Sequence, residues 1–424
     1  MTICALATSP GGALGIIRVS GPQSIEVLSR VFTKDVSSAQ PNTIHYGHIK
    51  DGTEIIDEVM VSVFRAPHSY TGEDSVEISC HGSRYILNKV LSLLIANGCR
   101  QANPGEFTQR AFLNGKMDLS QAEAVADLIA STNKATHQMA ISQLRGGISS
   151  ELSRLREQLL KLTSLLELEL DFSDHEDLEF ADRSELLDLT KTIDNHISRL
   201  AASFNTGNAL KNGIPVAIIG APNVGKSTLL NALLGEDRAI VSDIQGTTRD
   251  AIEDTIRLGG ITFRFIDTAG IRHTDDQIEL MGIDRSISAT QRARIVLMMT
   301  EPGVPYPDVP IREDQTVIHI ENKTDAFQAK YGVGLDNLRQ QLIDAAPKTA
   351  DSDVIVTNAR HYEALTRAHS HLQRVLDGME QHLSGDLLAE DLRLTLDTLA
   401  EITGGQITPQ ETLNNIFKHF CVGK

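Results

Sequence analysis

The sequence is poor in several residue types, and each shortage narrows what the protein can do. Tryptophan is absent and aromatic residues make up 4% of the 424 residues, so few side chains can stack on single-stranded bases. Only four cysteines occur, Cys4, Cys80, Cys99 and Cys421, and none forms a C-x-x-C pair. Scattered cysteines suit a reducing compartment, so we expect a cytoplasmic protein.

Long apolar runs and a basic excess are also missing. No run reaches the roughly 18 residues of a membrane span, and the first residues, MTICALA, lack the basic segment of a secretory signal. We therefore expect no contact with a membrane. The 39 basic residues are outnumbered by 56 acidic ones, which gives a formal charge of −17. Any contact with nucleic acid must then be local, or be provided by a partner.

The composition that remains is typical of a globular protein with several domains. Hydrophobic residues make up 41% of the chain and charged residues 22%. Because 424 residues exceed one ordinary hydrophobic core, we expect two or three domains.

The most informative stretch is Gly220–Ser227, which reads GAPNVGKS and matches G-x-x-x-x-G-K-S. It follows an apolar run typical of a buried strand, 214–219, and precedes a helical pattern, 228–234. Backbone N–H groups of such a turn converge on phosphate. Lys226 adds a positive charge for the β- and γ-phosphates, and the Ser227 hydroxyl can hold Mg²⁺. A glycine-rich turn without a ligand is the alternative for this pattern alone.

Two downstream motifs indicate a guanine-nucleotide switch. The alternating run 261–266 predicts a strand that ends at Asp267–Gly270. There Asp267 can reach Mg²⁺ through water, and the Gly270 N–H can meet the γ-phosphate. Upstream of this strand, the polar loop Gly246–Asp250 offers two hydroxyl groups to the metal.

A fourth motif specifies the base. The apolar run 316–320 leads into Asn322-Lys323-Thr324-Asp325. The Asp325 carboxylate can accept two hydrogen bonds from guanine, whereas adenine would leave both oxygens unpaired at a cost of about 1–3 kcal/mol. All four motifs follow in the order that GTP binding requires, so we predict a doubly wound parallel sheet that binds GTP.

The flanking regions predict different structures. The first 116 residues indicate an α+β unit, with strands at 15–20, 59–64 and 76–80 and a helix at 85–96. Arg18 and Glu77 are charges inside these strands, and alternation alone favours solvent-facing positions for them.

Helical patterns fill the remaining regions. Residues 119–210 include a leucine-striped helix that ends near Asp171, followed by an acidic tract, 171–182, that we interpret as a solvated loop. After Pro347 two more helices are predicted, 362–383 and 386–402, with a break at Gly404-Gly405.

Several long strings resemble the MnmE (TrmE) family of bacterial and organellar tRNA-modification GTPases, over nearly the whole chain. These strings are Tyr70–Asp74, Glu77, His81-Gly82, Pro104–Thr108, Arg110–Lys116, Gln121–Ala124 and the ending Phe420–Lys424.

This resemblance implies a multidomain fold. Residues 1–116 would form an α+β N-terminal domain that binds folate and dimerises. Residues 117–211 and 348–424 would form a discontinuous all-α helical domain, and residues 212–347 an inserted Ras-like α/β P-loop GTPase domain.

The resemblance also implies an activity and partners. A homodimer, together with a flavoprotein of the MnmG (GidA) family in a heterotetramer or larger complex, would add a carboxymethylaminomethyl-type group to C5 of the wobble uridine (U34) of certain tRNAs. A tetrahydrofolate derivative, 5-formyl or 5,10-methylene, would donate the one-carbon unit.

By position, Arg18, Glu77, Lys116 and Lys424 match the folate contacts of the family. Arg and Lys suit the glutamate tail of folate, and a carboxylate suits the donors of its pterin ring. Cys421 matches a family cysteine, and its role stays open.

The same resemblance extends to the hydrolytic site. Ile271 stands where Ras-like GTPases carry a glutamine that positions water, so the water must be held from elsewhere. We hypothesise that Glu279 does so, with Asn223 and Thr248 assisting. A K⁺ ion beside the phosphates would replace an arginine finger. Arg249 and Arg272 are rival fingers within the chain.

The predicted ligands divide into three sets. Ser227 and Thr248 would hold Mg²⁺. Asn223, Ser242, Ile244 and Thr247 would hold K⁺. The residues expected to contact GTP are Asn223, Val224, Gly225, Lys226, Ser227, Thr228, Ser242, Asp243, Ile244, Gln245, Gly246, Thr247, Thr248, Asp267, Thr268, Ala269, Gly270, Ile271, Arg272, Asn322, Lys323 and Asp325.

One stretch departs from the family pattern. Ala329-Lys330 resembles the fifth guanine-binding motif, yet only residues 326–328 separate it from Asp325. A helix and a strand normally lie between these motifs, so a segment is missing here.

Two rival functions share the GTPase motifs. A ribosome-assembly GTPase of the Era and EngA kind would be expected to carry a basic RNA-binding appendage, which this acidic chain lacks. The other rival is a purely structural dimeric scaffold, in which GTP hydrolysis only times the change between states.

Overall fold

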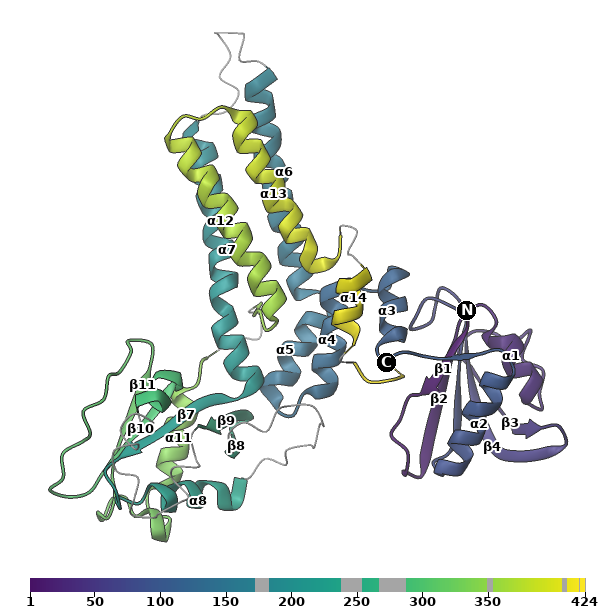
Figure 1. Ribbon diagram of the computed structural model, residues 1–424, viewed down its shortest axis with the longest axis horizontal. Helices are drawn as coiled ribbons and strands as arrows, with labels where there is room; N and C mark the ends of the chain where they lie inside the picture. Colours follow the sequence, from purple (N-terminus) through teal and green to yellow (C-terminus); the bar gives the residue numbers. More distant parts are fainter. Residues whose placement is uncertain are drawn as a thin grey trace. The chain divides into compact units, whose positions relative to one another are not determined.

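The computed structural model describes residues 1–171, 183–237, 254–266, 287–348, 354–405, 410–418 and 420–423. By its internal contacts the chain divides into two compact units. Figure 1 shows the helices and strands described below. The first unit comprises Met1–Ala130, Ile141–Ala181 and His382–Lys424, and the second comprises Ser131–Ala140 and Asp182–Gln381.

The first unit contains a sheet and several helices. Its elements are β1 (Ile3–Leu6), β2 (Leu14–Ser20), α1 (Ser24–Val31), β3 (Thr43–Asp51), β4 (Glu54–Phe64), β5 (Ser75–His81), α2 (Arg84–Ala96), β6 (Arg100–Gln101), α3 (Glu106–Leu113), α4 (Leu119–Ala130), α6 (Gly147–Asp171), α13 (Gly385–Thr403) and α14 (Gln410–Phe417).

The six strands are ordered β3-β4-β5-β2-β1-β6, and all neighbours are antiparallel except β1 and β6. Alternation along β2 sends Ile17 and Val19 into a core that α1 and α2 complete. In α2, Leu87, Val90 and Leu94 recur at helical spacing and are buried in the same core. The opposite face of the sheet therefore carries the alternate residues, including Arg18 and Glu77.

The second unit contains the nucleotide motifs. Its elements are α7 (Arg183–Asn212), β7 (Ile214–Gly220), α8 (Lys226–Asp237), β8 (Asp254–Leu258), β9 (Ile261–Phe265), β10 (Ile295–Thr300), β11 (Thr316–Glu321), the 3₁₀ helix η1 (Ala329–Tyr331), α11 (Leu335–Ala345) and α12 (Ala359–Glu380). Helix α5 (Lys134–Leu144) begins in the second unit and ends in the first.

The five strands of the second unit are ordered β11-β10-β7-β9-β8. All pairs are parallel except the β8–β9 hairpin, so the predicted parallel sheet is confirmed. Leucines of α8 and α11 bury one face of this sheet, and the helical residues 287–292 contribute Ala289 to the core on the other face. Residues 301–315 join β10 to β11 without any helix or strand.

The predicted elements outside the GTPase motifs are also confirmed. The strands predicted at 15–20, 59–64 and 76–80 lie within β2, β4 and β5, and the predicted helix at 85–96 lies within α2. The leucine-striped helix α6 ends at Asp171, as predicted, and it packs against α13.

The two C-terminal helices differ slightly from their predicted limits. Helix α12 ends at Glu380, three residues earlier than predicted, and α13 ends at Thr403, one residue later than predicted, where Gly404 caps it with φ 76°. In the second unit α12 packs against α7. The acidic tract 172–182 lies outside the described residues.

Among the residues that the structure describes, no helix combines the length and apolar character that crossing a membrane requires.

Candidate functional sites

The turn between β7 and α8 has the geometry of a phosphate-binding loop. Asn223 and Gly225 adopt positive φ angles of 62° and 96°. A Cβ on Gly220 would lie 2.6 Å from the Met299 carbonyl oxygen, and one on Gly225 would lie 2.5 Å from Asn322 Nδ2. Only glycine tolerates both the close approach and the backbone angle at position 225. The two glycines of the pattern, Gly220 and Gly225, are therefore required by packing at this turn.

Lys226, the first residue of α8, folds back over this loop. Its Nζ donates hydrogen bonds to the carbonyl oxygens of Gly220 and Ala221, both at 2.8 Å. Burial lowers the pKa of the Lys226 ammonium below its ordinary value. Within the described residues its partners are two carbonyl oxygens, and a partly buried cation held in this way gains much from an anionic ligand, so this residue fits a phosphate.

Asn322 ties the base motif to the phosphate loop. It follows β11 and is 5% exposed. Its Nδ2 donates to the Val224 carbonyl oxygen at 2.8 Å, and its Oδ1 accepts from the Ala329 N–H at 3.1 Å. Both ends of one buried amide are thus used, and they hold three motifs together.

The short loop after Asp325 still brings Ala329 to this position. No helix or strand occupies residues 326–328, as the sequence indicates. Instead, Thr324 and Phe327 close a tight turn, in which the Phe327 N–H donates to Thr324 Oγ1 and the Thr324 N–H donates to the Phe327 carbonyl oxygen, both at 3.1 Å. The fifth motif therefore lies beside the base motif despite the short spacing between them. Asp325 and Lys330 are exposed.

Lys323 makes a second link between the two loops. It adopts φ 62°, its Nζ donates to the Asn223 carbonyl oxygen at 3.5 Å, and it pairs with Glu301 at the end of β10. No sequence pattern distinguishes Glu301, because one acid after a strand is common.

Of the remaining predicted nucleotide residues, Ser227 and Thr228 are described and the others are not. Ser227 is half-buried in the first turn of α8, and Thr228 next to it is exposed. The predicted residues outside the described part of the chain are Ser242, Asp243, Ile244, Gln245, Gly246, Thr247, Thr248, Arg249, Asp267, Thr268, Ala269, Gly270, Ile271, Arg272 and Glu279.

In the first unit, Arg18 and Glu77 form a directly opposed pair on β2 and β5. Arg18 Nε and Nη2 both contact Glu77 Oε1 at 2.8 Å. The Arg18 guanidinium carbon lies 5.2 Å from the ring centre of Tyr70 and 5.7 Å from that of Phe107. The Arg18 side chain is 13% exposed, so the solvent-facing position that alternation favours is wrong for it.

The C-terminal tail reaches this pair. The Gly423 carbonyl oxygen accepts from Arg18 Nη1 at 3.3 Å, and the Cys421 carbonyl oxygen accepts from the Gly105 N–H at 3.3 Å. A Cβ on Gly423, which has φ 96°, would lie 2.1 Å from the Leu6 carbonyl oxygen. The tail therefore packs tightly against β1, while the Cys421 side chain is exposed.

Of the other two predicted folate residues, only Lys116 is described. Its Nζ donates to the Pro67 carbonyl oxygen at 2.9 Å, in the loop that also carries Tyr70. Lys424 lies outside the described residues. The structure thus brings Arg18, Glu77 and the tail together and places Lys116 against a neighbouring loop.

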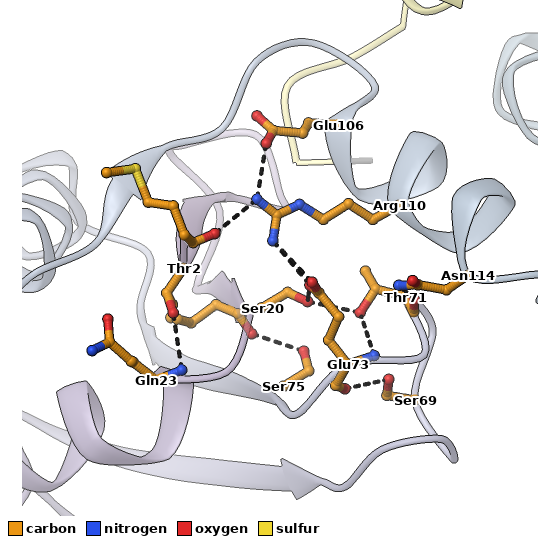
Figure 2. A network of polar contacts seen from close by, with 12 residues as sticks. Thr2, Ser20, Gln23, Ser69, Thr71, Glu73, Ser75, Glu106, Arg110 and Asn114 are labelled. Carbon is orange, nitrogen blue, oxygen red and sulfur yellow. Dashed lines mark hydrogen bonds and ion pairs between the residues drawn. The ribbon is translucent and has the colours of Figure 1, made fainter.

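A polar network holds the loop that carries Tyr70 (Figure 2). Arg110 on α3 donates to Glu73 Oε2 at 2.9 Å and to Glu106 Oε1 at 3.0 Å. Ser20 Oγ, at the end of β2, lies 2.8 Å from Glu73 Oε2 and 2.7 Å from Thr71 Oγ1. This network fixes the loop to both the sheet and α3.

Burial by itself raises the pKa of the Glu106 carboxyl group. Hydrogen bonds from Arg100, the Asn103 N–H and Arg110 more than offset burial, so the pKa lies below its ordinary value.

Sequence reasoning assigned no role to the aromatic residues around Arg18. Tyr70 occurs in one of the family strings, and its hydroxyl lies 2.8 Å from Thr108 Oγ1. Phe107 is fully buried beside it. The sequence does not distinguish an aromatic residue of the core from one that contacts a guanidinium group, so neither residue could be assigned this contact in advance.

Comparison with known families covers almost the whole chain. The family described as "GTP-binding protein TrmE N-terminus" matches residues 2–116, and the family described as "MnmE helical domain" matches residues 119–421. A likeness to the cytosolic domain of the T. maritima FeoB iron transporter in a GDP form covers 44% of this chain and 96% of that one, at 16% identity. Its TM-score is 0.22, too low to add to the fold.

Close relatives carry one common name. The tRNA modification GTPase MnmE of Bacteroides thetaiotaomicron is 54% identical, covering 100% of this chain and 99% of that protein. The protein of the same name from Porphyromonas gingivalis is 48% identical, covering 100% and 98%. The first match extends over 463 residues, more than the 424 of this chain, so the relative has residues without a counterpart here. The chain belongs to the MnmE (TrmE) family of tRNA-modification GTPases.

Proposed function

We propose that this chain hydrolyses GTP in the modification of C5 of the wobble uridine of tRNA. The observation that carries the proposal is the Asn322 amide, which joins the phosphate loop to both guanine-binding motifs. Relatives about half identical over their full length are named tRNA modification GTPases. A ribosome-assembly role is not favoured, because the relatives carry a different name and the chain is acidic.

Within this proposal, Lys226 binds the β- and γ-phosphates and Asp325 selects guanine. Ser227 fits Mg²⁺ by its place in the first turn of α8, and Thr248 would complete the set with it. When bound, Mg²⁺ neutralises phosphate charge.

Asn223 fits K⁺ because its side chain is exposed in the phosphate-binding loop between β7 and α8, where its amide oxygen can act as a ligand. Ser242, Ile244 and Thr247 would join it, and the bound ion would supply positive charge. We keep Glu279 as the residue that holds the attacking water.

These ion and water roles are tested by hydrolysis kinetics. We expect faster turnover in K⁺ than in Na⁺, loss of that difference in Asn223→Lys, and slow turnover in Glu279→Ala. Equal rates in the two salts would remove K⁺ from the proposal, and normal turnover in Glu279→Ala would remove that residue.

We extend the proposal to folate binding beside Arg18. Within the described residues, both contacts of the Arg18–Glu77 ion pair use Glu77 Oε1. The other carboxylate oxygen, Oε2, would accept a hydrogen bond from the pterin ring. Folate would supply a one-carbon unit. Lys116 and Lys424 would hold its glutamate tail, and the exposed Cys421 lies on the same C-terminal tail as Gly423. The donor species, 5-formyl or 5,10-methylene, is to be identified by binding.

Calorimetry with both folates tests this site. Glu77→Gln retains the shape of the side chain and removes its charge, so we expect at least roughly tenfold weaker binding. GTP hydrolysis should be unchanged, since the substitution lies in the other unit. Equal folate affinity in Glu77→Gln would remove this residue from the site.

We also propose that the chain forms a homodimer through the sheet face that carries Arg18. Large apolar side chains on this face are exposed: Leu14 by 66%, Ile44 by 66%, Tyr46 by 53% and Met60 by 52%. Tyr46 and Met60 are cross-strand partners, so they form one patch. Such a patch favours a second copy of the chain. A monomeric mass for the wild-type chain in sedimentation would contradict this, and Tyr46→Lys with Met60→Lys should weaken the dimer.

The deciding experiment is reconstitution with an MnmG-family flavoprotein, tRNA, GTP, K⁺ and a folate. We expect a carboxymethylaminomethyl-type uridine at position 34, detected by mass spectrometry. Hydrolysis of GTP without any change in the nucleoside, or wobble uridines fully modified in a deletion strain, would reject the proposal in favour of an assembly GTPase or a scaffold.

The proposed domain division is 1–116, 117–211 with 348–424, and 212–347, and the cytoplasm is the proposed location. Limited proteolysis tests the division by cleavage near residues 212 and 347.

A further inference from the structure

The β8–β9 hairpin of the second unit occupies a special place in the chain. Its strands pair in register from Asp254↔Phe265 to Leu258↔Ile261 and turn at Gly259-Gly260. In the sequence, β8 follows the Gly246–Asp250 motif and β9 leads into Asp267. Because paired strands move as one ribbon, a displacement at either motif is passed to the turn.

The turn lies against the beginning of α5. Asn133 Nδ2 donates to Thr262 Oγ1 at 2.8 Å, and the Ala135 N–H donates to the Gly260 carbonyl oxygen at 3.3 Å. A Cβ on Gly260 would lie 3.2 Å from the Cβ of Lys134, so the two backbones pack closely. We name Asn133, Lys134, Ala135, Gly260 and Thr262 the α5 joint.

Asn133 uses different atoms for the helix and for the hairpin. Its Oδ1 accepts from the Thr136 N–H at 2.9 Å, and its own N–H donates to Thr136 Oγ1 at 3.3 Å, which caps the first turn of α5. Its Nδ2 donates to Thr262. A shift of Thr262 therefore acts on the residue that starts the helix.

Helix α5 connects this joint to the rest of the chain. Met139 packs against the core of the five-stranded sheet. The division between the two units falls inside the helix, after Ala140. Because a continuous helix resists bending, a movement of its first turn reaches its last residues, which belong to the first unit.

We propose that the α5 joint transmits the state of the bound guanine nucleotide to α5, and through α5 to the first unit. This rests on the proposed GTP binding. Asn133 and Thr262 are positioning residues, and the joint must differ between nucleotide states to carry any coupling.

The absence of tryptophan makes a clean test possible. His137 is exposed on α5, so His137→Trp in the full chain adds one tryptophan fluorophore beside the joint. We expect its emission to differ between GDP and GDP with aluminium fluoride in K⁺. Thr262→Val removes one hydroxyl at nearly constant shape and should abolish most of this difference. Asn133→Ser retains a capping oxygen but loses the Nδ2 donor, so it should also abolish most of the emission difference.

Thr255→Val on β8 is the matched control, and it should retain the emission difference. Nucleotide affinity, measured by calorimetry, should stay within about twofold in all variants. A twofold change corresponds to about 0.4 kcal/mol of binding free energy. If a variant has a lowered melting temperature, amide hydrogen exchange of residues 131–140 in the unsubstituted chain, compared between the two nucleotide states, tests the same coupling.

The outcomes separate the two proposals. An emission difference that persists in Thr262→Val and Asn133→Ser overturns the proposed role of the α5 joint. The same holds if the emission of His137→Trp does not differ between the two states in a chain that binds and hydrolyses GTP. A chain that binds no guanine nucleotide overturns the proposed function, and the joint with it.

Discussion

The phosphate loop of the second unit and the Arg18–Glu77 pair of the first are built in opposite ways. The loop consists of consecutive residues, and Lys226 donates to carbonyl oxygens within it. Arg18 pairs with a carboxylate 59 positions away and contacts a carbonyl oxygen 405 positions away. Among the described residues, the contacts of Lys226 are with carbonyl oxygens and not with a carboxylate, so the first site suits an anion. The second is self-paired, so its residues also contribute to stability.

The largest effect on this comparison is expected from Lys226→Ala. Loss of the partly buried ammonium should lower the rate of GTP hydrolysis by about 100-fold or more, with little change in folding. Steady-state phosphate release measures the rate. Lys191→Ala, an exposed lysine on α7, is the control. A rate within a few fold of wild type would show that the loop does not use this charge.

Asp325→Asn sharpens the comparison at the base. Asp325 is exposed, so stability should be little changed. GTP should bind roughly 10- to 100-fold more weakly, because about 1–3 kcal/mol of hydrogen bonding is lost. Xanthosine triphosphate should bind better than before. Competition binding compares the two nucleotides, with Asp336→Asn as an exposed control. Unchanged preference for guanine would contradict the assigned role.

Glu106→Gln tests the claim that residues of the first unit contribute to stability. At pH 7 it should destabilise the unit by about 1–3 kcal/mol, because charged hydrogen bonds from Arg100 and Arg110 are weakened. Calorimetric melting measures the loss. Glu26→Gln removes an exposed ion pair and should cost far less.

The effect of Glu106→Gln should depend on pH. The pKa of Glu106 is lower in the folded chain, so its contribution is complete above the ordinary glutamate pKa of about 4.3 and is lost as the pH falls through the folded pKa. Wild type and variant should therefore converge in melting temperature on acidification below about pH 4. A gap that widens in acid would refute this account.

The smallest effect is expected from Glu301→Gln. Both partners of the Glu301–Lys323 pair are partly exposed, so the pair contributes about 0.2–1 kcal/mol. Guanine-nucleotide affinity should fall by about two- to fivefold as Lys323 loses its orientation. Stopped-flow release of a fluorescent nucleotide measures this, with Glu321→Gln as the control. An effect as large as that of Asp325→Asn would mean that Glu301 contacts the nucleotide.

The nucleotide motifs were predictable because their function depends on the backbone of short continuous segments. The Gly220–Ser227 pattern indicated the strand, the turn and the helix, and all three are confirmed. The short spacing between Asp325 and Ala329 was also evident in the sequence. The return of Ala329 to Asn322 was not, because it depends on a turn closed by Thr324 and Phe327.

Sequence alone thus determined the GTPase motifs, the family and the alternation of strands and helices, since each depends on residues that are neighbours in the chain. Tertiary structure decided that Arg18 lies against the rings of Tyr70 and Phe107, that Gly423 packs on β1, and that Asn133 contacts Thr262. These contacts join residues far apart in sequence, so their distances are fixed only when the sheets and helices pack, and no local pattern specifies that packing.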